Sequence, residues 1–265
     1  MNKSKEPNDN PYQALSPNQG LSPRKAVKSQ TRNWLLFLAI GFVLICLVLP
    51  ATRRSARPAA YRMQCSNNLK QIGLALHNYE SKYGQLPPAF TLDGEGKRLH
   101  SWRTLLLPFL EQADLYSRVD LTKSWEDPAN DAVRRVALSV YRCPSNNLQQ
   151  GQTIYLAVVC AKSSLQPNKG RAITEFVDPL SDTIVLYEAE PTQAVHWMSP
   201  EDADERMFLS SNGKSKTSHE GGRNALFADG HVQFLASKIS TEILRGMITI
   251  DGGEEPKNGN NSESK

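Results

Sequence analysis

Two histidines and an aspartate lie close together in residues 218–234, which read SHEGGRNALFADGHVQF. His219 precedes a pair of glycines, and Asp229 and His231 flank Gly230. Two imidazoles and a carboxylate form a ligand set that zinc or another divalent cation accepts. The spacing differs from H-E-x-x-H, in which one helical turn fixes two histidines, so no local geometry holds the three side chains together.

The Asp229-Gly230 pair is flanked by apolar residues, a pattern typical of a β-hairpin. Asp-Gly suits a type I′ turn, because this turn needs a positive φ at both central residues. In this interpretation the glycines permit close approach of the backbone, and His219 caps a backbone group. We favour the structural turn at Asp229 and Gly230, and the alternative is a divalent cation bound by His219, Asp229 and His231.

Other signatures of catalysis are missing from the sequence. It contains no G-x-S-x-G, H-E-x-x-H, Walker A or G-x-G-x-x-G pattern. The acidic residues Glu201, Asp202, Asp204 and Glu205 offer oxygen ligands for calcium, but they lack the EF-hand spacing, and we interpret them as a solvated loop. We therefore predict no catalytic residue, no organic cofactor and no enzymatic activity.

The composition is that of a globular protein with polar ends. The 265 residues are 39% hydrophobic and 22% charged with a net charge of +4, and basic residues gather in residues 1–33. No uniform basic surface is left to bind nucleic acid. Residues 1–33 and 251–265 lack an apolar period and are rich in polar residues, so we predict that both tails are disordered.

An apolar segment follows the first tail. From Trp34 to Leu49 the sequence WLLFLAIGFVLICLVL contains no charged residue. With its flanking residues this segment rises about 27 Å as a helix, close to a hydrocarbon core of about 30 Å. A cleaved signal peptide is the alternative, but the preceding region is long and no A-x-A site follows. We predict an uncleaved transmembrane helix over residues 34–50.

A long amphipathic helix is predicted after the span. Apolar residues recur at alternating intervals of four and three, which places them on one helix face. Gly84 suits the position after a helix end, and Pro87-Pro88 cannot continue the helix. The residues of this stripe are Cys65, Leu69, Ile72, Leu76, Tyr79 and Tyr83.

Shorter elements follow the long helix. Ser101 is a candidate N-cap for a helix in residues 102–116, and Asp127 followed by Pro128 marks another helix start. The segments QTIYLAVVCA, DTIVLYEAE and RNALFADGHVQFL then have the pattern of strands. A long helix, small helices and antiparallel strands predict an α+β fold in which a sheet packs against the apolar stripe.

Four segments follow one another along the chain: RMQCSNNLKQIGLALHNYESKYGQLPPAF, SWRTLLLPFLEQADLY, YRCPS and SHEGGRNALFADGHVQFL. Together they resemble a bacterial family of pseudopilin-like domain-of-unknown-function proteins, which have a prepilin-type N-terminus and are similar to general secretion pathway G proteins. The family is also known as H-X9-DG proteins, and His219 and Asp229-Gly230 fit that label. The resemblance implies a type IV pilin-like domain over residues 51–250, in which a long N-terminal helix packs on an antiparallel sheet.

The resemblance also implies a location. Basic residues flank both ends of the apolar segment, so the positive-inside rule does not orient it. The family likeness implies a single-pass protein of the bacterial inner membrane, with residues 1–33 in the cytoplasm and the C-terminal domain outside. The expected partners are the lipid bilayer and other pilin-like or secretion-system proteins.

A disulfide between Cys65 and Cys143 is predicted if the large domain faces an oxidising space. Cys65 lies on the apolar stripe, and Cys143 stands at the end of a short segment before Pro144. Cys46 lies within the predicted span, and Cys160 ends an apolar strand where an unpaired thiol packs well. No cysteines form a C-x-x-C pair. The alternative is that all three thiols beyond the span are free and buried.

The sequence therefore predicts a membrane-anchored pseudopilin-like protein, a structural or assembly component of a secretion or pilus-like system. An extracytoplasmic ligand- or glycan-binding module is one alternative, and it requires a concave site lined by aromatic residues such as Trp102, Trp125 and Trp197. A metal-dependent hydrolase is the second alternative, and it requires His219, Asp229 and His231 to converge.

We predict that no prepilin peptidase cleaves the chain. Members of the family that resemble true prepilins begin the apolar run with Gly-Phe-Thr-Leu-x-Glu, which is cleaved after the glycine. Here the run begins Arg32-Asn33-Trp34-Leu35 and contains no glutamate. The intact mass of the membrane-extracted protein is expected to include residues 1–33, and a mass that lacks them would disprove this prediction.

Overall fold

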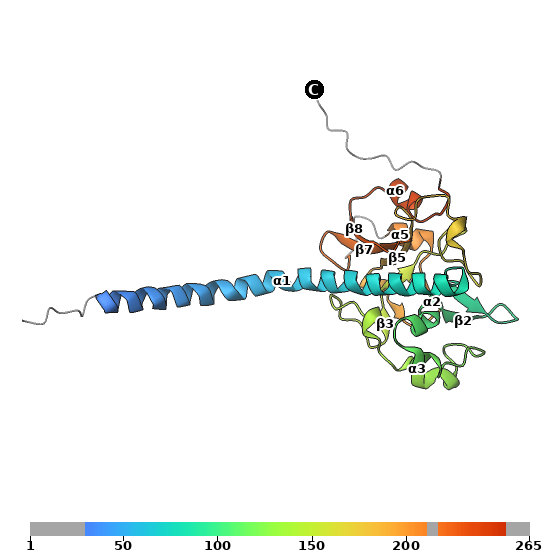
Figure 1. Cartoon of the computed structure of the whole chain (residues 1–265), viewed down its shortest axis with the longest axis horizontal. Coiled ribbons are helices and arrows are strands. Elements are labelled where there is room, and N and C mark those ends of the chain that lie inside the picture. The colour runs from blue at the N-terminus through green and yellow to red at the C-terminus, as the bar shows by residue number, and fades with distance from the viewer. Residues whose placement is uncertain (1–29, 211–216, 253–265) are drawn as a thin grey trace, which may run out of the picture. The chain divides into compact units, whose positions relative to one another are not determined.

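The protein has an α+β fold, as a computed structural model shows (Figure 1). The described residues form three antiparallel sheets and one long helix. The structure describes residues 30–210 and 217–252, except for the side chains of residues 30–32 and 47–56. The chain divides into two compact units between Thr52 and Arg53. The α+β class predicted from the sequence is confirmed.

Helix α1 spans Gln30–Tyr83, so residues 30–33 of the tail predicted to be disordered are helical. Residues 1–29 and 253–265 of the two predicted tails lie outside the described residues. Within the described part of the chain, no helix is both long enough and apolar enough to cross a membrane. Because the side chains of residues 47–50 are not described, the span over residues 34–50 stays a prediction.

The C-terminal part of α1 carries the predicted apolar stripe into the core of the second unit. Cys65, Leu69 and Ile72 are fully buried, whereas Tyr83 at the helix end is 51% exposed. The backbone N–H of Gly84 donates to the Glu80 carbonyl at 2.7 Å, and Gly84 has a φ of +72°. This left-handed residue ends the helix where the sequence predicted.

The helix predicted over residues 102–116 begins at the right place but is broken. Ser101 precedes α2, and its hydroxyl donates to the Trp197 carbonyl instead of capping the helix. Pro108 has no backbone N–H to continue an α-helical hydrogen-bond pattern, and the chain turns into a 3-10 helix there. The resulting elements are α2 (Trp102–Leu105), η1 (Leu107–Phe109) and α3 (Ala113–Tyr116).

Asp127 and Pro128 start a short helix as predicted. The Asp127 side chain accepts a hydrogen bond from the Ala129 backbone N–H at 3.0 Å. The remaining helical elements are η2 (Pro128–Asn130), α4 (Asp131–Arg134), η3 (Ser139–Tyr141), η4 (Ile173–Glu175), η5 (Pro191–Gln193), α5 (Glu205–Ser210) and α6 (Thr241–Gly246).

The main sheet has four antiparallel strands in the order β4-β5-β7-β8, and two small sheets pair β1 with β2 and β3 with β6. Every residue of the central strands β5 and β7 is buried, because the two strands are paired on both edges and covered on both faces. The strands are β1 (Phe90–Leu92), β2 (Arg98–Ser101), β3 (Gln152–Thr153), β4 (Tyr155–Ala157), β5 (Ile184–Glu188), β6 (Val195–His196), β7 (Gly222–Phe227) and β8 (Val232–Ala236).

The predicted hairpin at Asp229-Gly230 is confirmed, but its turn type is wrong. Gly230 has a φ of +89°, whereas Asp229 is not among the described residues with a positive φ, so the turn is not type I′. The Gly230 N–H donates to the Phe227 carbonyl at 2.9 Å, and the Phe227 N–H donates to the His231 carbonyl at 3.0 Å. The turn is therefore longer than two residues and needs only one left-handed position.

The tip of this hairpin packs against α1 at Gly73 and His77. A Cβ atom on Gly73 would lie 2.8 Å from Leu226 Cδ1 and 3.6 Å from Gly230 Cα. The absence of a side chain at Gly73 thus lets the helix and the hairpin approach closely.

Within the acidic run that was predicted to be a solvated loop, Asp202 instead forms an internal ion pair, whereas Glu201 and Asp204 are exposed as predicted. Asp202 Oδ1 lies 2.6 Å from Arg103 Nη2, and their side chains are 2% and 0% exposed. Asp204 accepts the Met207 N–H at 2.6 Å, and Glu205 pairs with Arg245 at 2.7 Å. Three of the four acidic residues therefore fix local structure.

We predict that Gly230→Ala destabilises the domain more than Gly96→Ala does. Both glycines have a similar φ, +89° and +84°, so both substitutions carry the strain of a left-handed alanine, about 1–2 kcal/mol. A Cβ at Gly230 would also meet His77 Nε2 at 3.1 Å, whereas nothing lies within 4 Å of one at Gly96. Urea denaturation gives the free energies of unfolding. Adding His77→Ala to each variant is expected to remove the difference between their losses of unfolding free energy. Equal losses in the two single variants would contradict the prediction.

Candidate functional site

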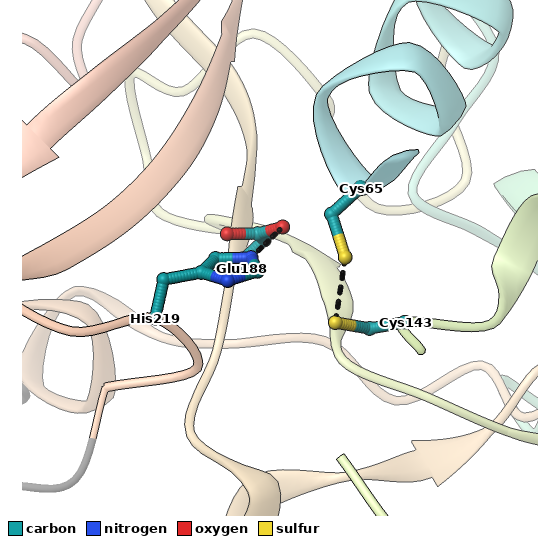
Figure 2. A group of neighbouring side chains, drawn as sticks. All are labelled: Cys65, Cys143, Glu188 and His219. Atoms are coloured by element: carbon teal, nitrogen blue, oxygen red, sulfur yellow. Dashed lines mark hydrogen bonds and ion pairs between the residues drawn. The ribbon is translucent and has the colours of Figure 1, made fainter. Parts of the chain in front are cut away.

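Four buried side chains from distant parts of the chain converge at the end of the central strand β5 (Figure 2). They come from α1, the segment after η3, the end of β5 and the segment before β7. Their ligand-type atoms all lie within 4.8 Å of one another. We call Cys65, Cys143, Glu188 and His219 the Cys–Glu–His cluster.

The two sulfur atoms of the cluster are in direct contact. Cys65 Sγ and Cys143 Sγ are 2.7 Å apart, and both side chains are fully buried. Asn68, one turn after Cys65 on α1, donates to the carbonyl of Arg142 at 3.0 Å and to that of Ser139 at 3.3 Å. Because Arg142 immediately precedes Cys143, these hydrogen bonds hold the second cysteine against the helix.

Glu188 ends the buried strand β5, and its side chain has no exposed surface. Oε2 accepts the Asn224 backbone N–H at 2.7 Å, and Oε1 accepts the Asn224 side-chain amide at 3.2 Å. His219 Nε2 lies 3.2 Å from Oε1. These polar contacts compensate the loss of water around the carboxylate, which a buried charge requires.

His219 is only 6% exposed, and both ring nitrogens have partners. Nε2 faces Glu188, and Nδ1 lies 3.2 Å from the Ser145 hydroxyl, two residues after Cys143. The histidine thereby links the segment before β7 to β5 and to the segment that carries Cys143. The prediction that His219 caps a backbone group is wrong, because its ring contacts side chains.

Electrostatic interactions within the cluster depend on the oxidation state of the cysteines. Burial by itself lowers the pKa of His219, but hydrogen bonds with Cys143 and Glu188, together with their negative charges, raise it to about 9. In the thiol form, the hydrogen bond from Cys65 lowers the pKa of Cys143, and the same bond raises the pKa of Cys65. In the free-thiol form, Cys143 is therefore the more acidic of the two cysteines.

The predicted metal ligands do not come together. His231 Nδ1 lies 2.6 Å from Asp229 Oδ1 at the surface of the hairpin turn, with both side chains partly exposed. His219 belongs instead to the buried cluster, which is the one metal-type group found among residues 30–210 and 217–252. The ligand set His219, Asp229 and His231 is therefore wrong, because the histidine that precedes the hairpin points into the core.

The tryptophans do not form an exposed aromatic site. Trp102 is fully buried and Trp197 is 1% exposed. Trp125 stacks on His196, with ring centroids 5.1 Å apart. Trp197 donates to the Val136 carbonyl at 2.8 Å, so its polar atom is also used inside the protein.

The cluster is closed to substrates. A surface cavity of about 730 Å³ is lined by residues of α5, α6 and the segment after β4, and no cluster residue lines it. Cys143, His219 and Glu188 follow the order of a nucleophile, a base and an orienting carboxylate, but a catalytic nucleophile must reach a substrate. The arrangement is therefore suited to a covalent or metal-mediated crosslink.

Glu188 is the cluster residue that the sequence did not reveal. The segment DTIVLYEAE was assigned to a strand, and a glutamate at the end of an apolar run is usually solvated. The residues before Glu188 do not alternate between apolar and polar, and this pattern indicates a strand that is buried on both faces. An ionisable residue at the end of such a strand needs a buried partner.

Comparison with known families finds a match to the part of the chain that carries two residues of this site. Residues 54–171 match the model of a family described as protein of unknown function (DUF1559). The match confirms the resemblance to a family of domain-of-unknown-function proteins, while the link to pseudopilins stays a prediction. The DUF1559 segment includes Cys65 and Cys143, and Glu188 and His219 follow it. No curated protein and no solved structure matches the chain significantly.

We predict that Cys65 and Cys143 form a disulfide in protein isolated without reductant. The structure brings the sulfur atoms of these two cysteines, 78 residues apart in the chain, into contact. Loop-closure entropy for a crosslink of this length corresponds to roughly 4.5 kcal/mol, which sets the order of magnitude of the stability lost in Cys143→Ser. Peptide mapping without reduction is expected to yield a linked Cys65–Cys143 peptide, with Cys160 alkylated. Complete alkylation of both cysteines in unfolded, unreduced protein would contradict the pairing.

Proposed function

We propose that the protein is a membrane-anchored, pseudopilin-like structural or assembly component of a secretion or pilus-like system. The observation that carries this proposal is the exposed apolar surface of α1 in the first unit. From Trp34 to Ile45 the large apolar side chains are at least 54% exposed. They are Trp34, Leu35, Leu36, Phe37, Leu38, Ile40, Phe42, Val43, Leu44 and Ile45.

A helix that is apolar around its whole circumference is suited to an apolar environment. Each large aliphatic or aromatic side chain gains about 1.5–3 kcal/mol when it leaves water. All ten side chains are largely exposed within the first unit. The apolar sequence continues through Leu49, and a lipid bilayer supplies a suitable environment for it.

The second unit supports a structural role. The same helix that carries the exposed apolar surface supplies Cys65, Leu69 and Ile72 to the hydrophobic core. The Cys–Glu–His cluster joins this helix to three other segments and is closed to substrates. A domain built to hold a long helix firmly is suited to an anchored component of an assembly.

The named residues do not form the features that the two alternative functions required. A binding module required exposed aromatic residues around a concave site, but Trp102 and Trp197 are buried in the core. A metal-dependent hydrolase required His219 to meet Asp229 and His231, and these residues occupy different sites. The structural role requires neither feature.

We predict that charge in the apolar part of α1 releases the protein from membranes. The double variant Leu38→Arg, Val43→Arg changes side chains that are 57% and 54% exposed, so the fold is not disturbed. In a bilayer each arginine costs about 2.5–3.5 kcal/mol at the helix centre. Membrane fractionation with carbonate washing is expected to find the wild type in the pellet and the variant largely in the supernatant.

The matched control is Leu74→Arg, which changes a side chain of α1 that is 64% exposed in the folded unit. This variant is expected to stay in the membrane pellet. Release of both variants, or of neither, would contradict the anchor. Protease added to intact spheroplasts is expected to digest the second unit, and digestion only after lysis would contradict its extracytoplasmic location.

A further inference from the structure

The buried pair of Glu188 and His219 requires an explanation that a disulfide does not supply. A disulfide uses two sulfur atoms and needs no carboxylate or imidazole beside it. Burying ionisable groups has a large desolvation penalty, and hydrophobic residues of similar size usually stabilise a core at least as well. Glu188 and His219 nevertheless point toward the two cysteines from two other segments (Figure 2).

We propose that, when both cysteines are reduced, the Cys–Glu–His cluster binds one Zn²⁺ ion. The ligands are Sγ of Cys65, Sγ of Cys143, Nε2 of His219 and Oε1 of Glu188. All four residues are buried, and one ligand-type atom of each lies within 4.8 Å of those of the other three.

The distances suit a four-coordinate site. With Zn–N and Zn–O distances of about 2.0 Å and Zn–S distances of about 2.3 Å, neighbouring ligands of a tetrahedral site are about 3.3–3.8 Å apart. His219 Nε2 and Glu188 Oε1 are 3.2 Å apart, which matches the nitrogen–oxygen edge. The sulfur atoms are 2.7 Å apart and must separate by about 1 Å, a shift that cysteine rotation can supply.

The types of donor atom in the cluster favour zinc over calcium and magnesium. Calcium and magnesium prefer oxygen ligands, and the cluster offers one carboxylate with two sulfurs and a nitrogen. Thiolate and imidazole ligands are those that zinc accepts in tetrahedral sites. With two thiolates, one carboxylate and a neutral imidazole, the bound site carries one net negative charge, fewer than a four-cysteine zinc site.

Hydrogen bonds outside the cluster hold the ligands in place. Ser145 lies 3.2 Å from His219 Nδ1, and when Nδ1 carries the proton and donates to it, Nε2 presents its lone pair to the metal. Asn224 donates to Glu188, and Asn68 holds the segment before Cys143. Such supporting contacts orient ligands before the metal binds.

Because the cluster is closed to solvent, the metal has a structural role. The metal would join α1, β5 and the segments around Cys143 and His219. The disulfide joins only α1 and the segment around Cys143. The thiols serve either the disulfide or the metal, so the site belongs to the reduced protein. The proposal does not depend on the membrane anchor.

The test is zinc binding by the full-length protein in detergent, reduced with a phosphine until thiol titration accounts for all 4 cysteines. After dialysis against Zn²⁺ and removal of excess metal, elemental analysis is expected to give one zinc per chain. Co²⁺ in place of zinc is expected to give the intense visible bands of tetrahedral thiolate coordination. The disulfide form is expected to bind none.

The variants Cys65→Ser, His219→Gln and Glu188→Gln are each expected to weaken binding at least tenfold. The controls are Cys160→Ser and His231→Gln, which alter a cysteine and a histidine outside the cluster and are expected to leave binding unchanged. A thermal melt with and without zinc identifies variants that do not fold, and zinc is expected to raise the Tm of the reduced wild type and of the two control variants more than that of the cluster variants. Absence of zinc from reduced, folded wild type would overturn the proposal, as would tight binding that survives Cys65→Ser and His219→Gln.

Discussion

The buried carboxylate of Glu188 sets the constraint on which the arrangement of the site depends. A carboxylate without exposed surface must be compensated by hydrogen-bond donors or by charge. Asn224 supplies two donors from β7, the neighbouring strand, and His219 supplies an imidazole from the segment just before it. These contacts fix how β5 and the residues before β7 lie relative to one another. They also hold the His219 ring in the core, where it contacts Ser145 and Cys143. The buried carboxylate of Glu188 therefore constrains how four segments of the chain pack together.

The long helix meets this polar centre through small and polar residues. Cys65 and Asn68 lie one turn apart on α1, where the cysteine contacts Cys143 and the asparagine holds the segment before it. Farther along, Gly73 lets the β7–β8 hairpin approach the helix backbone, and Leu226 fills the space where a side chain would be. A helix with larger residues on this face would be displaced from the sheet. The hydrophobic stripe therefore supplies the free energy of packing, and these residues decide where the helix lies.

The sequence predicted those features that local physics determines. The end of α1 at Gly84, the start of a helix after Asp127, the strands and the hairpin all follow from periodicity and from capping or turn residues. Features that depend on distant partners were missed or wrong. The helix after Ser101 breaks at Pro108, and the turn needs one positive φ instead of two. His219 was grouped with the nearby Asp229 and His231, but its partners lie 31 and 74 residues earlier in the chain, at Glu188 and Ser145. The predicted pair Cys65–Cys143 is the exception, because its two sulfur atoms are in contact although the residues lie 78 positions apart in the chain.

In the anchored protein that we propose, the position of Cys65 decides where a force along α1 would first reach the core. Residues 57–64 of α1 are exposed, and Cys65 is the first buried residue of the helix among those described. Tension applied along α1 from an anchor would reach the core first at this residue. A crosslink there, whether a disulfide to Cys143 or a metal shared with His219 and Glu188, would transfer the load to three other segments before the apolar contacts of Leu69 and Ile72 are stressed. A crosslink farther along the helix would leave the first buried turn free to separate from the sheet. The placement of the cluster at the first buried residue of the helix therefore suits the anchored structural role that we propose.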